Sequence, residues 1–123
     1  MSSIVLWVSD LQAQEDFYSR LFGVPVVGST NGFVEVSDGK NSVLLHQLET
    51  EYQVPTPLTQ KLEAISEAAI KPIFTVASIK ESKARTSETF ATFATDSLTH
   101  GEFIYVDITD PEGNVIQIRE NKS

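Results

Sequence analysis

The sequence contains no cysteine, which excludes disulfide bonds, thiolate metal ligands and a cysteine nucleophile. Histidine is scarce too, since only His46 and His100 are present, and no Ser-His-Asp arrangement supports nucleophilic hydrolysis. No apolar run approaches the ~20 residues of a membrane-spanning helix, and no basic region followed by an apolar stretch predicts a signal peptide. We therefore expect a cytoplasmic protein that does not enter a membrane.

Basic residues are also few. Nine Lys and Arg stand against 17 Asp and Glu, for a formal net charge of -8. This balance argues against nucleic-acid binding, which requires a basic face. The six glycines are scattered through turns and one helix end, so no glycine-rich phosphate loop is present. A chain of 123 residues with 41% hydrophobic residues is long enough to bury a core of its own.

The chain carries the same plan twice. In the first half, an apolar run at 4–8 predicts a strand, Ser9-Asp10 begins a helix that Gly23 ends, and strands follow at 24–27, 33–36 and 43–48. In the second half, a strand at 73–76 precedes a capping box at Ser78–Glu81, a helix to about Thr89, and strands at 90–94, 102–108 and 115–119. We predict an α+β fold in which two β-α-β-β-β modules form one mixed, cup-shaped sheet. The single domain spans 1–123, with module 1 at 1–52, a linker helix at 53–70 and module 2 at 71–123.

The most informative segment is Asp110-Pro111-Glu112-Gly113-Asn114, followed by an apolar strand. Its turn chemistry between two β-rich runs predicts a hairpin. The chain resembles the glyoxalase/bleomycin resistance/dioxygenase superfamily, whose fold is called vicinal oxygen chelate. The resemblance rests on this segment, on the duplicated order of elements, and on the Phe17-Tyr18 pair in a helix ended by Gly23. The chain is closest in style to metal-free, bleomycin-resistance-like members. The resemblance also suggests a homodimer.

The resemblance places the family's metal ligands at Ser3, His46, Lys71 and Gln117. A divalent metal needs three or four converging carboxylate or imidazole ligands, and a lysine ammonium competes with a metal. We therefore expect no cofactor and no intact metal site. If a metal does bind, His46 and Gln117 are its expected ligands.

Side chains alternate across a strand, so we expect Ser3, Val5 and Trp7 to face the cup while Ile4, Leu6 and Val8 face the helix. The predicted ligand-binding residues are Val5, Trp7, Leu44, Ile73 and Val115 as apolar walls, and His46, Thr75, Gln117 and Arg119 as polar contacts. Trp7 could stack on a flat ligand or simply fill the cup, and Arg119 could anchor an anion or be a solvated strand end. His46 is either a ligand contact or a half-buried histidine with a protein partner, and a one-residue slip in register would turn it away. Phe103, Tyr105 and Asp107 share one face of their strand, but the sequence leaves open which face.

Three functions remain open at this stage. The first is metal-free binding of a small molecule in the cup. The second is a metal-dependent lyase, isomerase or dioxygenase of the same superfamily. The third is a protein-interaction module whose cup is vestigial. The incomplete ligand set favours a binding protein over an enzyme.

Overall fold

A computed structural model describes residues 3–52 and 68–123. The elements follow in the order β1 (Ser3–Val8), α1 (Leu11–Phe22), β2 (Phe33–Ser37), β3 (Ser42–Gln47), the 3-10 turn η1 (Thr50–Tyr52), β4 (Ile73–Thr75), α3 (Ile79–Arg85), β5 (Thr92–Phe93), β6 (Leu98–His100), β7 (Phe103–Thr109) and β8 (Val115–Asn121). The α+β prediction and the two βαβββ-type modules are confirmed. Most of the predicted linker helix lies outside the described residues, and residues 68–70 are not helical. No helix within the described ranges is both long and apolar enough to cross a membrane.

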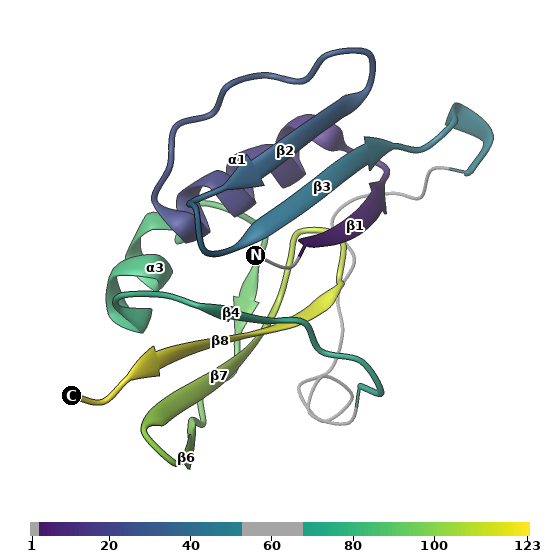
Figure 1. Ribbon diagram of the computed structural model, residues 1–123. Coiled ribbons are helices and arrows are strands. Elements are labelled where there is room, and N and C mark those ends of the chain that lie inside the picture. Colours follow the sequence, from purple (N-terminus) through teal and green to yellow (C-terminus); the bar gives the residue numbers. More distant parts are fainter. Residues whose placement is uncertain (1–2, 53–67) are drawn as a thin grey trace.

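The strands form two mixed sheets, one per module, where the sequence predicted one sheet. The first has the order β1-β3-β2, and the second β4-β8-β7-β5 with β6 also paired to β7. In each module the first strand runs parallel to the last strand, and the other pairs are antiparallel. Figure 1 shows α1 against the first sheet, with α3 beside it. The two modules thus repeat one arrangement, as the duplicated sequence predicted.

Local capping sets the ends of both helices. The Asp10 side chain accepts a hydrogen bond from the Ala13 amide, and Gly23 ends α1 in the left-handed conformation, at φ 72°. Ser78 caps α3 through the Glu81 amide. However, α3 ends at Arg85 rather than near Thr89. The Thr86 hydroxyl donates to the Ser82 carbonyl, and such a local bond competes with helix continuation.

The prediction of a strand at 24–27 is wrong. No strand forms there, because the Glu15 carboxylate on α1 accepts the Val27 and Gly28 amides at 3.2 and 3.0 Å. These amides are therefore unavailable for a sheet, and the first sheet has three strands. Conversely, β6 was not predicted, and it contains His100.

One core unites the modules. Apolar residues of α1 pack with those of both sheets in a single buried cluster. At its centre, the Phe74 ring lies 5.2 Å from the Phe22 ring and 6.3 Å from the Tyr18 ring, between centroids. Because Phe74 belongs to module 2 and the other two to module 1, neither half has a complete core alone.

The turn at residues 110–114 joins the modules by hydrogen bonds. The Glu112 carboxylate accepts the backbone amides of Ser9 and Asp10, at the junction of β1 and α1. The fully buried Asp110 carboxylate accepts the Tyr18 hydroxyl at 2.8 Å and the Gln14 side-chain amide at 3.0 Å. Burial, then the charge of Asp110, raises the pKa of the Tyr18 hydroxyl well above 10.0. The segment that carries the family resemblance is thus a structural clamp between modules.

A second connection lies at the other end of the sheets. The Asn41 side chain donates to the Thr75 carbonyl at 2.8 Å and accepts the Thr75 amide at 3.2 Å. The paired amide groups satisfy the backbone of the edge strand β4 where it lacks a neighbour. Together, the two connections hold β1 and β4 in a fixed relation at both ends.

Candidate binding site

Each sheet has one face covered by the helices and one face turned away from them. On β1, Val8 is buried while Val5 and Trp7 are 53% and 61% exposed. Period-two alternation therefore places Val5 and Trp7 on the exposed side of the first sheet, as predicted. We call this side the module 1 face, and the equivalent side of the second sheet the module 2 face.

Three aromatic rings cross the module 1 face in a row. Trp7 pairs with His46 in the parallel ladder, and their rings stack with centroids 4.5 Å apart. His46 pairs in turn with Phe33 on β2, with ring centroids at 4.7 Å. We call Trp7, His46 and Phe33 the aromatic row. Val5 and Leu44 form the next pair along the same face.

The structure thus settles which way His46 points. Val43 and Leu45 are fully buried, so Leu44 and His46 lie on the opposite side, with Trp7. Phe33 was not among the predicted site residues. Its place opposite His46 follows from the β2–β3 hairpin, whose turn at residues 38–41 pairs Ser37 with Ser42 and so sets the register.

The centre of the module 2 face is a polar cluster. Asp107 on β7 lies opposite Gln117 on β8, and its carboxylate accepts the Gln117 side-chain amide at 2.9 Å. The other carboxylate oxygen binds the Lys71 ammonium, also at 2.9 Å. Both charged side chains are mostly buried, at 19% and 15% exposure. We call Lys71, Asp107 and Gln117 the Lys71 cluster. The sequence had left open which face of its strand Asp107 occupies.

Next to this cluster, the Arg119 guanidinium is held from three directions. Its Nε donates to the Thr75 hydroxyl at 2.9 Å, and its Nη1 lies 3.4 Å from the Tyr105 hydroxyl. The guanidinium carbon lies 4.0 Å from the centre of the Phe103 ring, a cation–π contact. Among the described residues, no carboxylate forms an ion pair with Arg119. The face therefore presents a fixed cation on an otherwise neutral support.

The structure places the predicted site residues on two faces. Val5, Leu44, Trp7 and His46 lie together on the module 1 face, and Ile73, Thr75, Gln117 and Arg119 lie together on the module 2 face. Ile73 pairs with Gln117, and Thr75 pairs with Arg119. The sequence missed Phe33, Asp107 and Tyr105 as neighbours of these residues, since their contacts depend on strand register.

The donor chemistry of these faces does not fit the family's metal. Of the four matching positions, Lys71 carries an ammonium already paired with Asp107, and Gln117 turns its amide nitrogen to the same carboxylate. Ser3 pairs with Ser42, whose hydroxyl donates to the Glu35 carboxylate at 2.6 Å, so that this carboxylate at the same end of the face already has a protein partner. Within residues 3–52 and 68–123, no three His, Cys, Asp or Glu side chains gather as a metal would require.

The comparisons with known proteins agree with the fold and the module plan. Residues 1–118 match the family described as the Glyoxalase/Bleomycin resistance protein/Dioxygenase superfamily. The chain belongs to this superfamily.

Among solved structures, a glyoxalase/bleomycin resistance protein from Albidiferax ferrireducens T118 shares 16% identity, with a TM-score of 0.67 over 98% of both chains. A lactoylglutathione lyase from Agrobacterium tumefaciens shares 22% identity, with a TM-score of 0.58 over 99% of this chain and 93% of that one. A glyoxalase-related enzyme from Fulvimarina pelagi shares 16% identity, with a TM-score of 0.63 over 98% and 87% of the two chains. Among curated proteins, no sequence matches. The structural similarities therefore extend to the fold and do not carry an activity.

Proposed function

We propose that this protein binds a small organic molecule on the module 1 and module 2 faces, without the metal ion of its family. The observation that carries the proposal is the aromatic row. Trp7 is 61% exposed, and its ring stacks on that of His46, with the centroids 4.5 Å apart. A pre-positioned aromatic surface loses little conformational entropy when a flat ligand stacks on it.

The polar groups of the module 2 face would set the orientation of that ligand. Gln117, Thr75 and Arg119 are already held by protein partners, so their directions are fixed before binding. Small-molecule sites typically combine apolar walls with a few such polar groups. The apolar walls here are Val5, Leu44 and Ile73, of which Val5 and Ile73 are 53% and 49% exposed.

The metal-free part of the proposal rests on Lys71. An ammonium at a position where the family places a metal ligand repels a divalent cation. Because Lys71 and Asp107 form a mostly buried pair, removing the charge of one would leave the other unpaired. The pair would therefore resist replacement by a metal. Elemental analysis of protein purified without chelator should find less than one bound transition metal per chain, and a stoichiometric metal would contradict this part.

The binding proposal is tested by fluorescence, because Trp7 is the only tryptophan. A library of flat aromatic compounds is screened for quenching, and hits are measured by calorimetry. Trp7→Ala should weaken binding of a hit about fivefold or more, since one stacked aromatic contact and its buried area are lost. Tyr52→Ala is the matched control, because Tyr52 is an equally exposed aromatic at 65% that lies outside both faces, on η1. Equal affinity of wild type and Trp7→Ala would remove the aromatic row from the site.

A second candidate function is association with another copy of the chain. The observation in its favour is the exposure of Val5, Trp7 and Ile73, large apolar side chains that a homodimer would cover. Trp7→Glu would then shift the protein from dimer to monomer in analytical ultracentrifugation. A wild-type monomer at all concentrations would contradict this candidate and leave the ligand-binding proposal untouched.

A further inference from the structure

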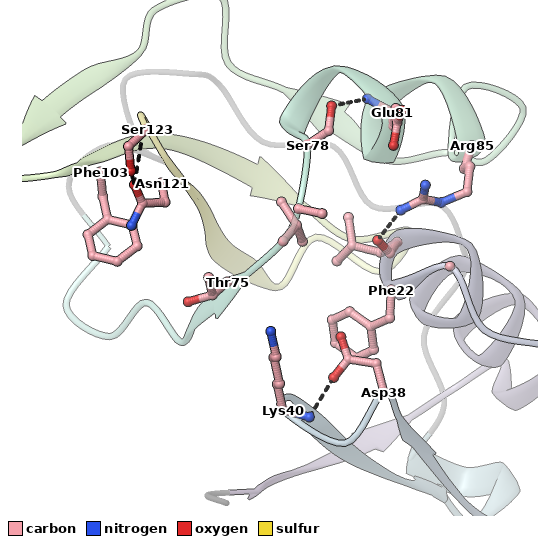
Figure 2. A pocket seen from close by; sticks show the side chains of 14 residues that line it. Phe22, Asp38, Lys40, Thr75, Ser78, Glu81, Arg85, Phe103, Asn121 and Ser123 are labelled. Atoms are coloured by element: carbon pink, nitrogen blue, oxygen red, sulfur yellow. Dashed lines mark hydrogen bonds between the residues drawn. The ribbon is translucent and has the colours of Figure 1, made fainter.

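A cavity of about 670 Å³ lies where the modules meet, beside the module 2 face, with which it shares Thr75 and Phe103. Four segments line it: the end of α1 at Leu21–Gly23, the β2–β3 turn with Asp38 and Lys40, the residues from β4 into α3, and the open end of β7 and β8. Figure 2 shows these segments around one space, with the Lys40 side chain extending into it toward Thr75. Its volume falls within the range of about 300–1,000 Å³ that is usual for small-molecule sites.

Lys40 supplies a positive charge that no carboxylate of residues 3–52 or 68–123 pairs with. No hydrogen bond or ion pair of its ammonium occurs within the described ranges. Asp38, its neighbour in the turn, is already engaged by three donors: the Lys40 amide at 2.8 Å, the Asn41 amide at 2.6 Å and the Asn41 side chain at 3.0 Å. The nearest carboxylate in sequence thus serves the turn rather than the ammonium.

A second cation lies on the opposite wall. The Arg85 guanidinium donates to the carbonyls of Arg20 and Leu21 at the end of α1, at 2.6 and 3.0 Å. These bonds use Nε and Nη2 and leave Nη1 with no protein acceptor within the described ranges. Gly23 leaves room for this arrangement, since a Cβ there would lie 3.3 Å from the Arg85 guanidinium carbon. Glu81 is the one other acidic residue of the lining, on the solvent side of α3.

Apolar groups complete the walls. Phe22 and Val76 are buried at 8% and 9% exposure, and each has its edge on the cavity. Phe103 lines the far end of the cavity, and the Arg119 guanidinium lies over the Phe103 ring. We propose that this cavity is a second binding site, for a small molecule that joins a carboxylate or phosphate group to a compact apolar body. The anionic group pairs with Lys40, and the apolar body lies against Phe22 and Val76, with Arg85 on the opposite wall.

Such a ligand would touch both modules at once, because Lys40 and Phe22 belong to module 1 while Val76 and Arg85 belong to module 2. Its binding would add to the contact between Asn41 and Thr75 that already closes this end of the molecule. A ligand that binds only the joined modules raises the free energy of unfolding in proportion to the logarithm of its concentration.

The test uses benzoate and phenyl phosphate as probes, with benzamide as the neutral probe of similar shape. Binding is followed by amide chemical shifts in two-dimensional NMR of the full chain. We expect either or both anions to shift the amides of Gly23, Lys40, Ala77 and Ser78, with the preferred anion identifying the charged group, and benzamide to leave them in place. Lys40→Met should weaken the binding about tenfold or more, since one charge-assisted hydrogen bond is lost.

Lys80→Met is the matched control, because Lys80 is an exposed lysine of α3 that does not line the cavity. It should bind the anions as the wild type does, and Lys40→Arg should retain most of the affinity. The proposal fails if neither anion shifts these amides, if benzamide shifts them equally, or if Lys40→Met binds with unchanged affinity. Because Trp7 is not involved, none of these outcomes bears on the ligand-binding proposal for the two faces.

Discussion

Asp110 provides the sharpest test of the clamp between the modules. Its carboxylate is fully buried and accepts five hydrogen bonds. Oδ1 accepts the amides of Glu112 and Asn114, and Oδ2 accepts the side chains of Gln14, Tyr18 and Asn114. Asp110→Asn keeps the shape of the side chain but replaces Oδ2 with an amide that donates.

The cost follows from the three donors around Oδ2. The Tyr18 hydroxyl can turn and accept from the new amide. The side-chain amides of Gln14 and Asn114 cannot, because their N–H groups would face another N–H donor and lose their acceptor. Two hydrogen bonds to a charged group are lost, at about 1.5 kcal/mol or more each. Gln14 can lower the cost by turning over, because its Oε1 is buried without a hydrogen-bond partner in the described part of the chain. We therefore expect a loss of about 2–4 kcal/mol in the free energy of unfolding.

Urea unfolding followed by circular dichroism measures this loss. The matched control is Asp16→Asn, which removes an exposed carboxylate of α1. This carboxylate pairs with Arg20, also on α1, at 3.0 Å. Such an i,i+4 pair contributes about 0.5 kcal/mol or less. If Asp110→Asn lost no more stability than Asp16→Asn, the clamp would not hold the modules together and our account of the 110–114 turn would be wrong.

Two further predictions concern stability. The pKa of the Tyr18 hydroxyl is raised by burial and by Asp110, so its stabilising effect is complete below pH 10 and is lost as pH rises, when the unfolded chain releases this proton first. The stability difference between wild type and Tyr18→Phe, from urea unfolding, should therefore shrink between about pH 9 and about pH 11; a constant difference would contradict it. Gly23→Ala should destabilise the protein more than Gly39→Ala in thermal unfolding: both glycines have positive φ, but a Cβ at Gly23 approaches Arg85 to 3.3 Å and one at Gly39 meets nothing. Equal losses would show that the Arg85 contact is unimportant.

Much of the fold was predictable because it depends on local patterns. Alternation assigned Val5 and Trp7 to one side and Val8 to the other, and the caps at Asp10, Gly23 and Ser78 fixed where helices begin or end. The failures came from contacts that no local pattern records. The valine-rich run at 24–27 has the composition of a strand, but the Glu15 carboxylate on α1 accepts the amides of Val27, its last residue, and of Gly28, which follows it.

The candidate site was predictable only in part, for a related reason. The residues expected on the cup side do lie on the exposed faces, since this requires only the period of each strand. The neighbours they meet depend on the register between paired strands, and a shift of one residue would change every pair. Asp107 meets Gln117 because the 110–114 turn sets the pairing of β7 with β8, and Phe33 meets His46 because the turn at residues 38–41 sets the pairing of β2 with β3. The cavity beside Lys40 needs four segments in place, and no single one of them indicates it.

The bond between Glu112 and the start of α1 has a consequence for the order in which the protein forms. It joins residues 103 and 102 positions apart, so the amides of Ser9 and Asp10 have no acceptor until synthesis has reached Glu112 in module 2. Contacts of such long range slow folding, because a large loop must close before they can form. When only module 1 has emerged from the ribosome, the amides at the start of α1 would thus lack their acceptor, and the core would lack the residues that module 2 contributes. Its folding should be completed by the last hairpin to emerge, rather than proceed module by module.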